Sequence, residues 1–303
     1  MSARSGGAVS TSLVAPRAAP ARPGRRPEAP AIPHALRGAE VVIKYGGAVM
    51  ADAALSDSWA RDVALLHAGG VRAVVVHGGG PALTRMLSRL GIPSSFDDGQ
   101  RVTTAEAAEV AEMVLSGRIN KQVVARLARA GARALGLSGT DAGLIRVRRH
   151  RPGGRDLGFV GEVERLDPAP LRLLLDHGFV PVLSSTAADE DGNPHNINAD
   201  LVAGAAAGAL KAGALVFLSD VPGVMRDGAL VPRLTSSEAR RALADGTAVG
   251  GMRPKLRAAL DAIGRGVPSV RLADGREPHA LLRALLSPAG CGTVVAAGAG
   301  ERA

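Results

Sequence analysis

Two glycine-rich turns, each at the end of a short apolar run, constrain the fold of this chain more than any other feature. KYGG (44–47) follows Val41–Ile43, and HGGG (77–80) follows Ala73–Val76. Both runs are apolar and rich in β-branched residues, which predicts short buried strands. Glycines at a strand end let backbone N–H groups approach an anion without an intervening Cβ, and a following helix adds its positive end. One such turn is typical of ordinary strand–helix punctuation, but two of them, with Lys44 in the first, indicate a site for several phosphate oxygens.

Strand-like and helix-like patterns alternate from Gly38 onward. This alternation predicts an α/β fold, a three-layer αβα sandwich with a central, mostly parallel sheet. One departure is a hairpin expected from 143–149 and 156–164, across an arginine-rich turn. We expect helices at 54–68, 81–90, 104–115, 120–130, 170–177, 200–211, 236–245, 253–265 and 277–286. Further strands are expected at 132–137, 179–183, 214–218 and 267–271.

Composition narrows the possible partners. The formal charge is +9, but residues 1–40 carry six arginines against Glu28 and Glu40, and aromatic residues make up only 2% of the chain. Too few aromatic side chains remain for base stacking, so the charge favours anionic small molecules over nucleic acid. No apolar stretch is long enough and uninterrupted enough to cross a membrane.

The cysteine content and the N-terminal segment bear on location. A single cysteine, Cys291, rules out an internal disulfide framework and suits a reducing compartment, and we expect it to be a small core residue. Residues 1–33 contain six prolines and no sustained apolar period, which predicts disorder. Alternatives for this segment are an organelle transit peptide and a translation start placed too early. We expect a cytoplasmic protein.

Three further motifs carry polar groups at places where chains turn. NINAD (196–200) precedes a helical pattern, SDVPGV (219–224) follows a predicted strand, and GGMRPK (250–255) leads into another helix. Asparagine and aspartate at a helix start are ordinarily caps, and Lys255 could be a solvated surface residue. A lysine next to the positive end of a helix is favourable, however, if an anion binds there. Strand ends are also where open α/β sheets bind ligands.

Several common sites are not indicated. The chain contains neither a GxxxxGK[ST] loop nor a GxGxxG fingerprint. No histidine, cysteine or glutamate cluster has metal-ligand spacing, so no metal held by protein side chains is expected. His77 follows a buried run, and we interpret it as structural.

Taken in order, these motifs resemble those of the acetylglutamate kinase family within the amino acid kinase superfamily. KYGG, HGGG and SDVPG are typical of the superfamily. GQRVT (99–103), EMVLSG (112–117) with Asn120-Lys121, and NINAD are more specific to the acetylglutamate enzymes. The resemblance covers about residues 38–295. It implies two lobes that share one sheet, with a disordered extension at 1–37, a substrate-binding and dimerising lobe at 38–195 and an ATP-binding lobe at 196–303.

The resemblance also implies a reaction and a site. ATP, with Mg²⁺ carried mainly by its phosphates, would phosphorylate the γ-carboxylate of N-acetyl-L-glutamate, the second step of arginine biosynthesis through acetylated intermediates. Lys44 and Lys255 would hold phosphoryl oxygens and Asp200 would orient the two lysines. The implied acetylglutamate site comprises Gly79, Gly80, Arg101, Asn196 and Asn198. The implied phosphate and nucleotide site comprises Gly46, Gly47, Gly78, Ser219, Asp220, Gly223 and Gly251.

The chain departs from the family pattern in the segments that concern regulation. Arginine-inhibited relatives have an N-terminal helix that links dimers into a hexamer, whereas prolines interrupt the corresponding segment here. A Glu and a Phe-Thr pair of those relatives are also missing before Gly292-Thr293. We therefore predict a homodimer with weak or absent arginine feedback. Thr140 and His195 stand where Lys and Tyr are common, and neither replaces an implied catalytic group.

Two other functions fit the same residues. A related kinase could act on another N-blocked amino acid, such as an aminoadipate derivative, since one methylene changes rates by only about 10–200-fold. A sensor that binds nucleotide or amino acid without turnover is the third hypothesis. Retention of Lys44, Asp200 and Lys255 argues against it, because binding alone does not need both lysines.

Overall fold

A large twisted sheet runs through the centre of the computed structural model, which describes residues 32–97, 100–287 and 291–298. The sheet is eight-stranded, and all neighbouring strands are parallel except β15 and β16. Its order is β14 (Arg233–Thr235), β16 (Thr293–Ala296), β15 (Ser269–Asp274), β11 (Ala214–Ser219), β1 (Glu40–Tyr45), β2 (Arg72–His77), β8 (Val180–Ser184) and β5 (Ala134–Leu137). The predicted mostly parallel sheet is confirmed.

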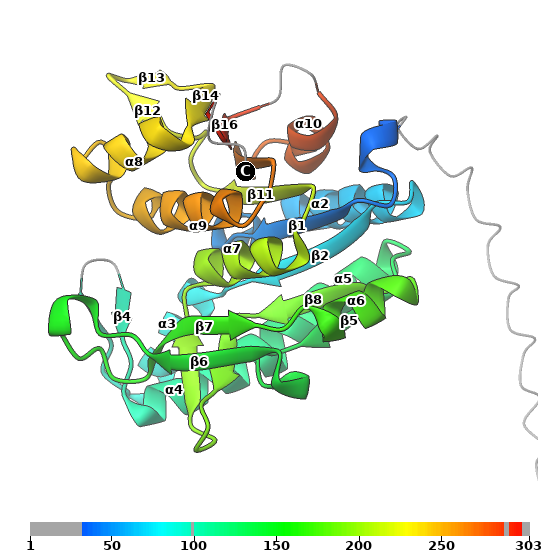
Figure 1. The fold of residues 1–303 in the computed structure, drawn as a ribbon. Coiled ribbons are helices and arrows are strands. Elements are labelled where there is room, and N and C mark those ends of the chain that lie inside the picture. Colours follow the sequence, from blue (N-terminus) through cyan, green and yellow to red (C-terminus); the bar gives the residue numbers. More distant parts are fainter. Residues whose placement is uncertain (1–31, 98–99, 288–290, 299–303) are drawn as a thin grey trace, which may run out of the picture.

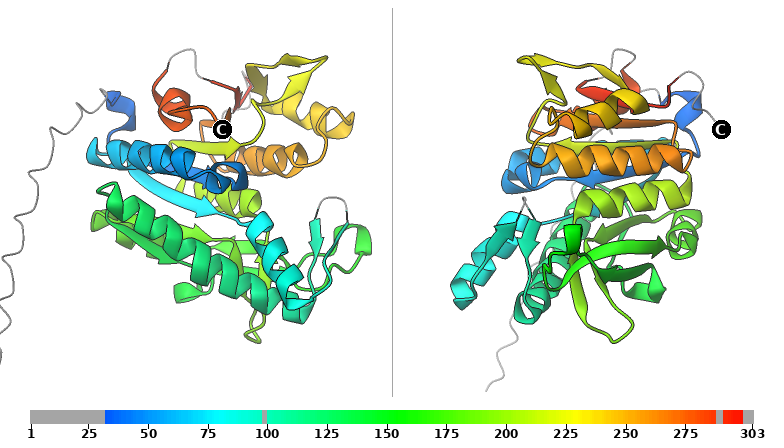
Figure 2. Two further views of the ribbon diagram at one scale, coloured as in Figure 1. Left: turned by 180° about the vertical axis from the view of Figure 1, so that it is seen from behind. Right: turned by 60° about the vertical axis from the view of Figure 1, so that its left-hand side comes forward.

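Helices cover both faces of this sheet, because alternate residues of each strand point to opposite sides. In β1, Val41 and Ile43 pack into one apolar cluster, whereas Val42 packs into the other. Figure 1 views the face with α7 (Ala199–Leu210) and α9 (Met252–Gly264), and the left view of Figure 2 shows the opposite face. The remaining helices are α1 (Gly47–Ala51), α2 (Ala53–Ala68), α3 (Gly80–Leu90), α4 (Ala105–Glu112), α5 (Asn120–Arg129), α6 (Ala169–Asp176), α8 (Ser236–Ala244) and α10 (Ala280–Leu286). The three-layer prediction is therefore confirmed.

A second, smaller sheet lies beside the main one near α3 and α4 (Figure 1). It contains the predicted hairpin as β6 (Ile145–Arg149) and β7 (Val160–Leu166), an antiparallel pair. Two strands that the sequence did not reveal complete it, β10 (Pro194–Ile197) and β9 (Thr186–Ala188). Two short hairpins were also not foreseen, β3 (Ser95–Asp97) with β4 (Gln100–Val102) and β12 (Met225–Arg226) with β13 (Ala229–Leu230).

The predicted helices at 104–115 and 120–130 form one continuous helical run. A π-helical segment, Met113–Ile119, joins α4 to α5. Gly117 does not end the helix, and a Cβ there would meet open space. The wider turns of the π segment let the helical run continue from α4 into α5.

Residues 1–31, where most of the predicted disorder falls, lie outside the described residues. The described remainder of the predicted 1–37 extension is ordered against the rest of the chain: Ile32 is buried in an apolar cluster, and a single 3₁₀ turn covers His34–Leu36. Cys291 is partly buried and packs against the apolar cluster that includes α10.

Candidate active site

Three charged side chains from distant parts of the chain meet at the carboxyl end of the main sheet. Asp200 lies in the first turn of α7, with Oδ1 2.9 Å from Nζ of Lys44. Its Oδ2 lies 3.0 Å from Nζ of Lys255, in the first turns of α9. Lys44 reaches this point because β1 ends there, and Asn198 caps α7 by accepting from the Asp200 amide at 2.8 Å. One carboxylate therefore holds two ammonium groups.

The charge state of this cluster follows from its surroundings. Asp200 is only 4% exposed. Burial raises the pKa of its carboxyl, but the charges of Lys44 and Lys255 outweigh burial and hold the pKa below its ordinary value. The cluster thus carries one negative and two positive charges, and it has positive charge to offer a phosphoryl group.

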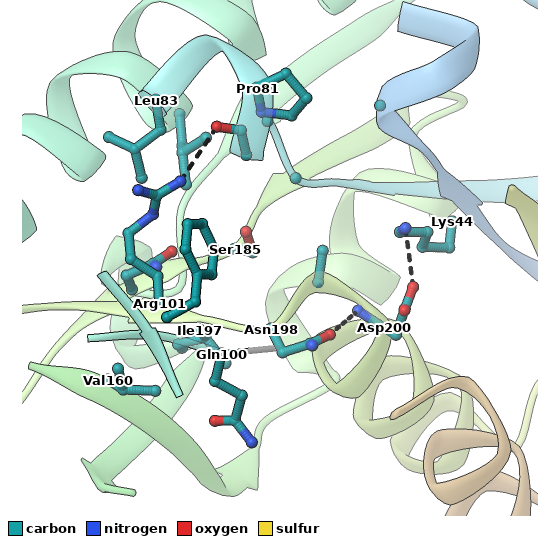
Figure 3. Close-up of a pocket in the computed structure, with 18 residues that line it drawn as sticks. Lys44, Pro81, Leu83, Gln100, Arg101, Val160, Ser185, Ile197, Asn198 and Asp200 are labelled. Atoms are coloured by element: carbon teal, nitrogen blue, oxygen red, sulfur yellow. Dashed lines mark hydrogen bonds and ion pairs between the residues drawn. The ribbon is translucent and has the colours of Figure 1, made fainter. Parts of the chain in front are cut away.

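A cavity of about 270 Å³ extends from this cluster between the two glycine-rich turns and the second sheet. In Figure 3 Arg101 lies at one side of the cavity, and Lys44 with Asp200 lies at the other. The lining residues are Lys44, Gly47, Gly78, Gly79, Gly80, Pro81, Leu83, Phe96, Gln100, Arg101, Leu115, Val160, Ser185, Asn196, Ile197, Asn198, Ala199 and Asp200. The first cavity therefore has a cationic group at each end, and both polar and apolar residues line the walls between them.

Close packing explains one glycine of the second turn. A Cβ on Gly79 would lie 2.2 Å from Cδ1 of Ile119 and 2.7 Å from Cδ2 of Leu115. These two side chains belong to the π-helical segment, so the turn and that segment touch without space for a side chain. Because Gly79 has no side chain, the backbone of the turn itself forms part of the cavity wall.

Arg101, on β4, is buried and held from several directions. Its Nη2 donates to Oγ1 of Thr84 at 2.6 Å, its Nη1 donates to Oγ of Ser94, and its guanidinium lies over the Phe96 ring, 4.6 Å from the centroid. Burial lowers the pKa of Arg101 from its ordinary value. Because the ordinary pKa of arginine lies far above neutrality, the group stays charged near neutral pH, and it is suited to bind a carboxylate.

A second cavity of about 400 Å³ opens on the other side of Lys255. Its walls are largely apolar, and the first turn of α9 lies at one end. The lining residues are Asp220, Val221, Pro222, Gly223, Val224, Met225, Thr247, Val249, Gly251, Met252 and Lys255. Lys255 thus faces the second cavity while its ammonium contacts Asp200, which lines the first.

Comparison with known proteins shows to which family this chain belongs. The amino acid kinase family model matches residues 39–274. Acetylglutamate kinase from Parasynechococcus marenigrum (strain WH8102) is 49% identical over 272 residues, 88% of this chain and 92% of the relative. The chain belongs to the acetylglutamate kinases of the amino acid kinase family. The family enzyme of Gluconacetobacter diazotrophicus is 48% identical over 268 residues, 85% of this chain and 86% of that one.

Solved structures of amino acid kinase relatives share the fold. N-acetylglutamate synthase from Neisseria gonorrhoeae, complexed with coenzyme A and N-acetyl-glutamate, superposes with a TM-score of 0.78 at 26% identity, covering 87% of this chain and 61% of that one. Carbamate kinase from Giardia lamblia bound to AMP-PNP gives a TM-score of 0.65 at 17% identity, over 86% of this chain and 99% of that one.

The structure brings most of the sequence-predicted site residues to the two cavities. Lys44, Gly47, Gly78, Gly79, Gly80, Arg101, Asn196, Asn198 and Asp200 line the first. Asp220, Gly223, Gly251 and Lys255 line the second.

Gly46 and Ser219 line neither cavity. A Cβ on Gly46 would lie 2.4 Å from the carbonyl oxygen of Leu218, so this glycine serves the close approach of two chain segments. Ser219 is buried and donates to the carbonyl of Val221 at 3.3 Å, within the turn that follows β11.

Sequence reasoning missed several residues of the cavity walls. Phe96 comes from the β3–β4 hairpin and Ser185 from the segment between β8 and β9. Gln100 lies within the GQRVT motif, but no role was inferred for it. Phe96 lies in a strand of three residues and Ser185 lies between two strands, so neither stretch has a periodic pattern long enough to place its residue. Only a motif, as for Gln100, could have indicated them.

Within the described ranges, no group of three or more histidine, cysteine, aspartate or glutamate side chains could hold a metal ion. Among the helices that the structure describes, none is long and apolar enough to span a bilayer.

Proposed function

We propose that this chain transfers the γ-phosphoryl group of ATP to the γ-carboxylate of N-acetyl-L-glutamate, the second step of arginine biosynthesis through acetylated intermediates. The observation that carries the proposal is the first cavity, with Arg101 at one end and the Lys44–Asp200–Lys255 cluster at the other. N-acetylglutamate has a carboxylate at each end. The α-carboxylate would pair with Arg101, which directs the γ-carboxylate toward the lysines.

The reaction suits a site without a general base. A carboxylate is ionised near pH 7, so no proton needs to be removed before it attacks phosphorus. The obstacle is the approach of an anion to a triphosphate and the charge of the transferring group. Lys44 and Lys255 would hold phosphoryl oxygens from two sides, and Asp200 would keep both ammonium groups directed at them.

The glycine-rich turns complete this design. Backbone N–H groups around Gly47 and Gly79 would bind the γ-phosphoryl group, with Gly46 and Gly78 shaping the turns. Gly80, Asn196 and Asn198 would contact the rest of the acetylglutamate. This division agrees with the positions of all but Gly46 on the wall of the first cavity.

The second cavity would take the nucleotide. Its apolar walls suit an adenine ring, and Asp220 and Gly223 would line that pocket, with Gly251 at the start of α9 and Ser219 in the adjoining turn. Mg²⁺ would enter with the nucleotide, held chiefly by its phosphates. The metal ion would reduce the negative charge that the attacking carboxylate meets.

The arrangement of lobes and subunits is part of the same proposal. The substrate lobe would span 38–195 and the ATP lobe 196–303, joined where β1 pairs with β11. We expect a cytoplasmic homodimer with weak or absent arginine feedback. The last two expectations rest on residues 1–33, where prolines interrupt the segment that would have to form a continuous helix to link dimers. A hexamer by light scattering, or strong inhibition by sub-millimolar arginine, would contradict this expectation.

The decisive experiment traps the product. Purified protein is incubated with ATP, Mg²⁺, hydroxylamine and either N-acetyl-L-glutamate, L-glutamate or N-acetyl-2-aminoadipate. We expect a hydroxamate selectively with N-acetylglutamate. Product with the aminoadipate derivative alone would retain the reaction but change the substrate. No product with any acceptor, from protein that binds ATP, would favour a sensor.

A further inference from the structure

His77 is buried at the end of β2, directly before the second glycine-rich turn, and both of its ring nitrogens have partners. Nδ1 lies 3.0 Å from the carbonyl oxygen of Gly78. Nε2 lies 3.1 Å from Nδ2 of Asn120, the first residue of α5. The histidine thus joins the turn to a buried asparagine, and the mechanism above uses neither side chain.

The orientation of the Asn120 amide is determined by its other partners. Its Nδ2 lies 2.8 Å from the carbonyl oxygen of Val182 and 3.3 Å from that of Leu137. Carbonyl oxygens only accept, so the nitrogen must face them. Its Oδ1 accepts from Nζ of Lys121 at 3.1 Å, and an ammonium group can only donate. The amide therefore fits in one orientation.

This orientation decides where the proton of His77 lies. Nδ2 of Asn120 has two hydrogens: one points to the Val182 carbonyl, and the other is shared between the Leu137 carbonyl and Nε2 of His77. Because an amide nitrogen cannot accept, Nε2 of His77 must be the acceptor, which leaves the proton on Nδ1. Nδ1 then donates to the carbonyl of Gly78. Burial lowers the pKa of His77 to about 4, and the charge of Lys121 acts in the same direction, so the ring is neutral near pH 7.

Fixing the Gly78 carbonyl also fixes the next N–H group. A trans peptide is planar, with its C=O and N–H directed oppositely, and the described backbone contains no cis peptide. The N–H in question belongs to Gly79, which lines the first cavity. Two glycines in succession have wide conformational freedom, so an external constraint on their shared peptide matters more here than elsewhere.

We propose that the hydrogen-bond chain from Lys121 through Asn120 and His77 to the Gly78 carbonyl positions the Gly79 N–H for the transferring phosphoryl group. His77 and Asn120 are then positioning residues for catalysis, and the Asn120-Lys121 pair of the sequence has a role. This inference rests on the proposed function, since it names how one phosphoryl-binding group of that site is held.

The kinetic test compares variants of His77 in the full chain. His77→Asn keeps an N–H donor near the position of Nδ1, whereas His77→Gln places its amide near Nε2 and His77→Leu has no donor. We expect His77→Leu and His77→Gln to lose about 10²–10³-fold in kcat and His77→Asn to retain kcat within about tenfold. KM for both substrates should stay within about threefold, because the N–H acts chiefly in the transition state.

Asn120→Leu tests the next link, and Asp62→Asn is the control. Without Asn120 the tautomer is no longer selected, and we expect about a 10–100-fold loss in kcat. Asp62 is equally buried and hydrogen-bonded, at 2.7 Å to His279, but lines neither cavity of the site. Its variant should keep kcat. Folded His77→Leu and Asn120→Leu proteins with kcat within twofold of the wild type would overturn the proposal.

A spectroscopic measurement keeps the inference independent of enzyme activity. In histidine-selective ¹⁵N NMR of the unliganded wild type, the imidazole signal that is lost in His77→Asn should be that of a neutral ring protonated on Nδ1. A signal lost in His77→Asn that reports protonation on Nε2 near pH 7 would refute the hydrogen-bond chain. If the wild type makes no acyl phosphate, the proposed substrate fails while this spectrum still decides the geometry.

Discussion

The ammonium group of Lys255 lies 3.0 Å from Oδ2 of Asp200, although 55 positions separate the two residues in the chain. Helix packing creates this contact, because Asp200 lies in the first turn of α7 and Lys255 in the first turn of α9. The two helices approach so closely that a Cβ on Gly204 would lie 2.8 Å from the carbonyl oxygen of Ala258. The distance between the start of α7 and the start of α9 is therefore set by small residues along both helices.

Lys255→Ala should lose about 10²–10³-fold in kcat with a smaller change in KM. Its charge is needed most when negative charge is spread over the transferring group. The measurement is hydroxamate formation at saturating ATP and acetylglutamate. Lys211→Ala, at the exposed end of α7, is the matched control and should keep the wild-type rate. An unchanged kcat for Lys255→Ala would remove this lysine from the mechanism.

Gly204→Ala should reduce both stability and kcat. The added methyl group meets backbone atoms of Ala258, so α9 must move, which costs about 1–3 kcal/mol and shifts Lys255 away from Asp200. Urea unfolding and steady-state kinetics measure the two effects. Gly264→Ala, at the end of α9 where a Cβ meets nothing within 4 Å, should be as stable as the wild type. Equal behaviour of the two variants would show that α7–α9 packing does not limit the site.

Arg101→Lys should raise KM for acetylglutamate by about 10–100-fold and leave KM for ATP nearly unchanged. Lysine retains the charge but cannot make two parallel hydrogen bonds to a carboxylate, and it loses the contacts with Thr84 and the Phe96 ring. Initial rates with each substrate varied in turn provide the test. Arg85→Lys, on the exposed side of α3, serves as control. A parallel rise in KM for ATP would contradict the assignment of Arg101 to the acetylglutamate end.

Asp189→Asn should weaken the dependence of stability on pH under acid conditions. Burial raises the pKa of Asp189, but hydrogen bonds from His195 and Asn193 outweigh it and lower the pKa from 3.8 to about 2. A depressed pKa adds stability that is present above the unfolded value, near 3.8, and lost as the pH falls through about 2. Urea unfolding between about pH 5 and pH 2 should show less proton uptake for the variant.

The control for the acid series is Asp191→Asn. Asp191 is exposed in the same turn, and its backbone N–H, which the substitution leaves in place, donates to Asp189. We expect its pH profile to match that of the wild type. If the Asp189 and Asp191 variants have the same slope, the hydrogen bonds that Asp189 accepts from His195 and Asn193 do not contribute to acid stability.

Local patterns were sufficient for much of the fold. The strands and helices before and after HGGG appear within one residue of their predicted bounds, as Arg72–His77 and Gly80–Leu90. The hairpin of β6 and β7 was also predicted. In each case a run of apolar residues with one period is bounded by glycine or proline, so neighbours in sequence carry the necessary information.

Short strands whose pairing partners lie far away in the sequence were not predicted. β16 (Thr293–Ala296) has only four residues and gains its place by pairing antiparallel with β15 and parallel with β14. β9 and β10 are short in the same way. Strands of this length carry too few residues for alternation to be recognised, and their partners lie far away in the sequence.

The sequence by itself determined the family, the strand–helix alternation and the presence of Lys44, Asp200, Arg101 and Lys255 in recognisable motifs. Motifs and periodicity are properties of adjacent residues. Only the tertiary structure decided that one carboxylate holds two lysines, that Phe96 and Ser185 wall the first cavity, and that Asn120 selects the tautomer of His77. These relationships depend on the packing of helices and strands from separate regions, which no local pattern specifies.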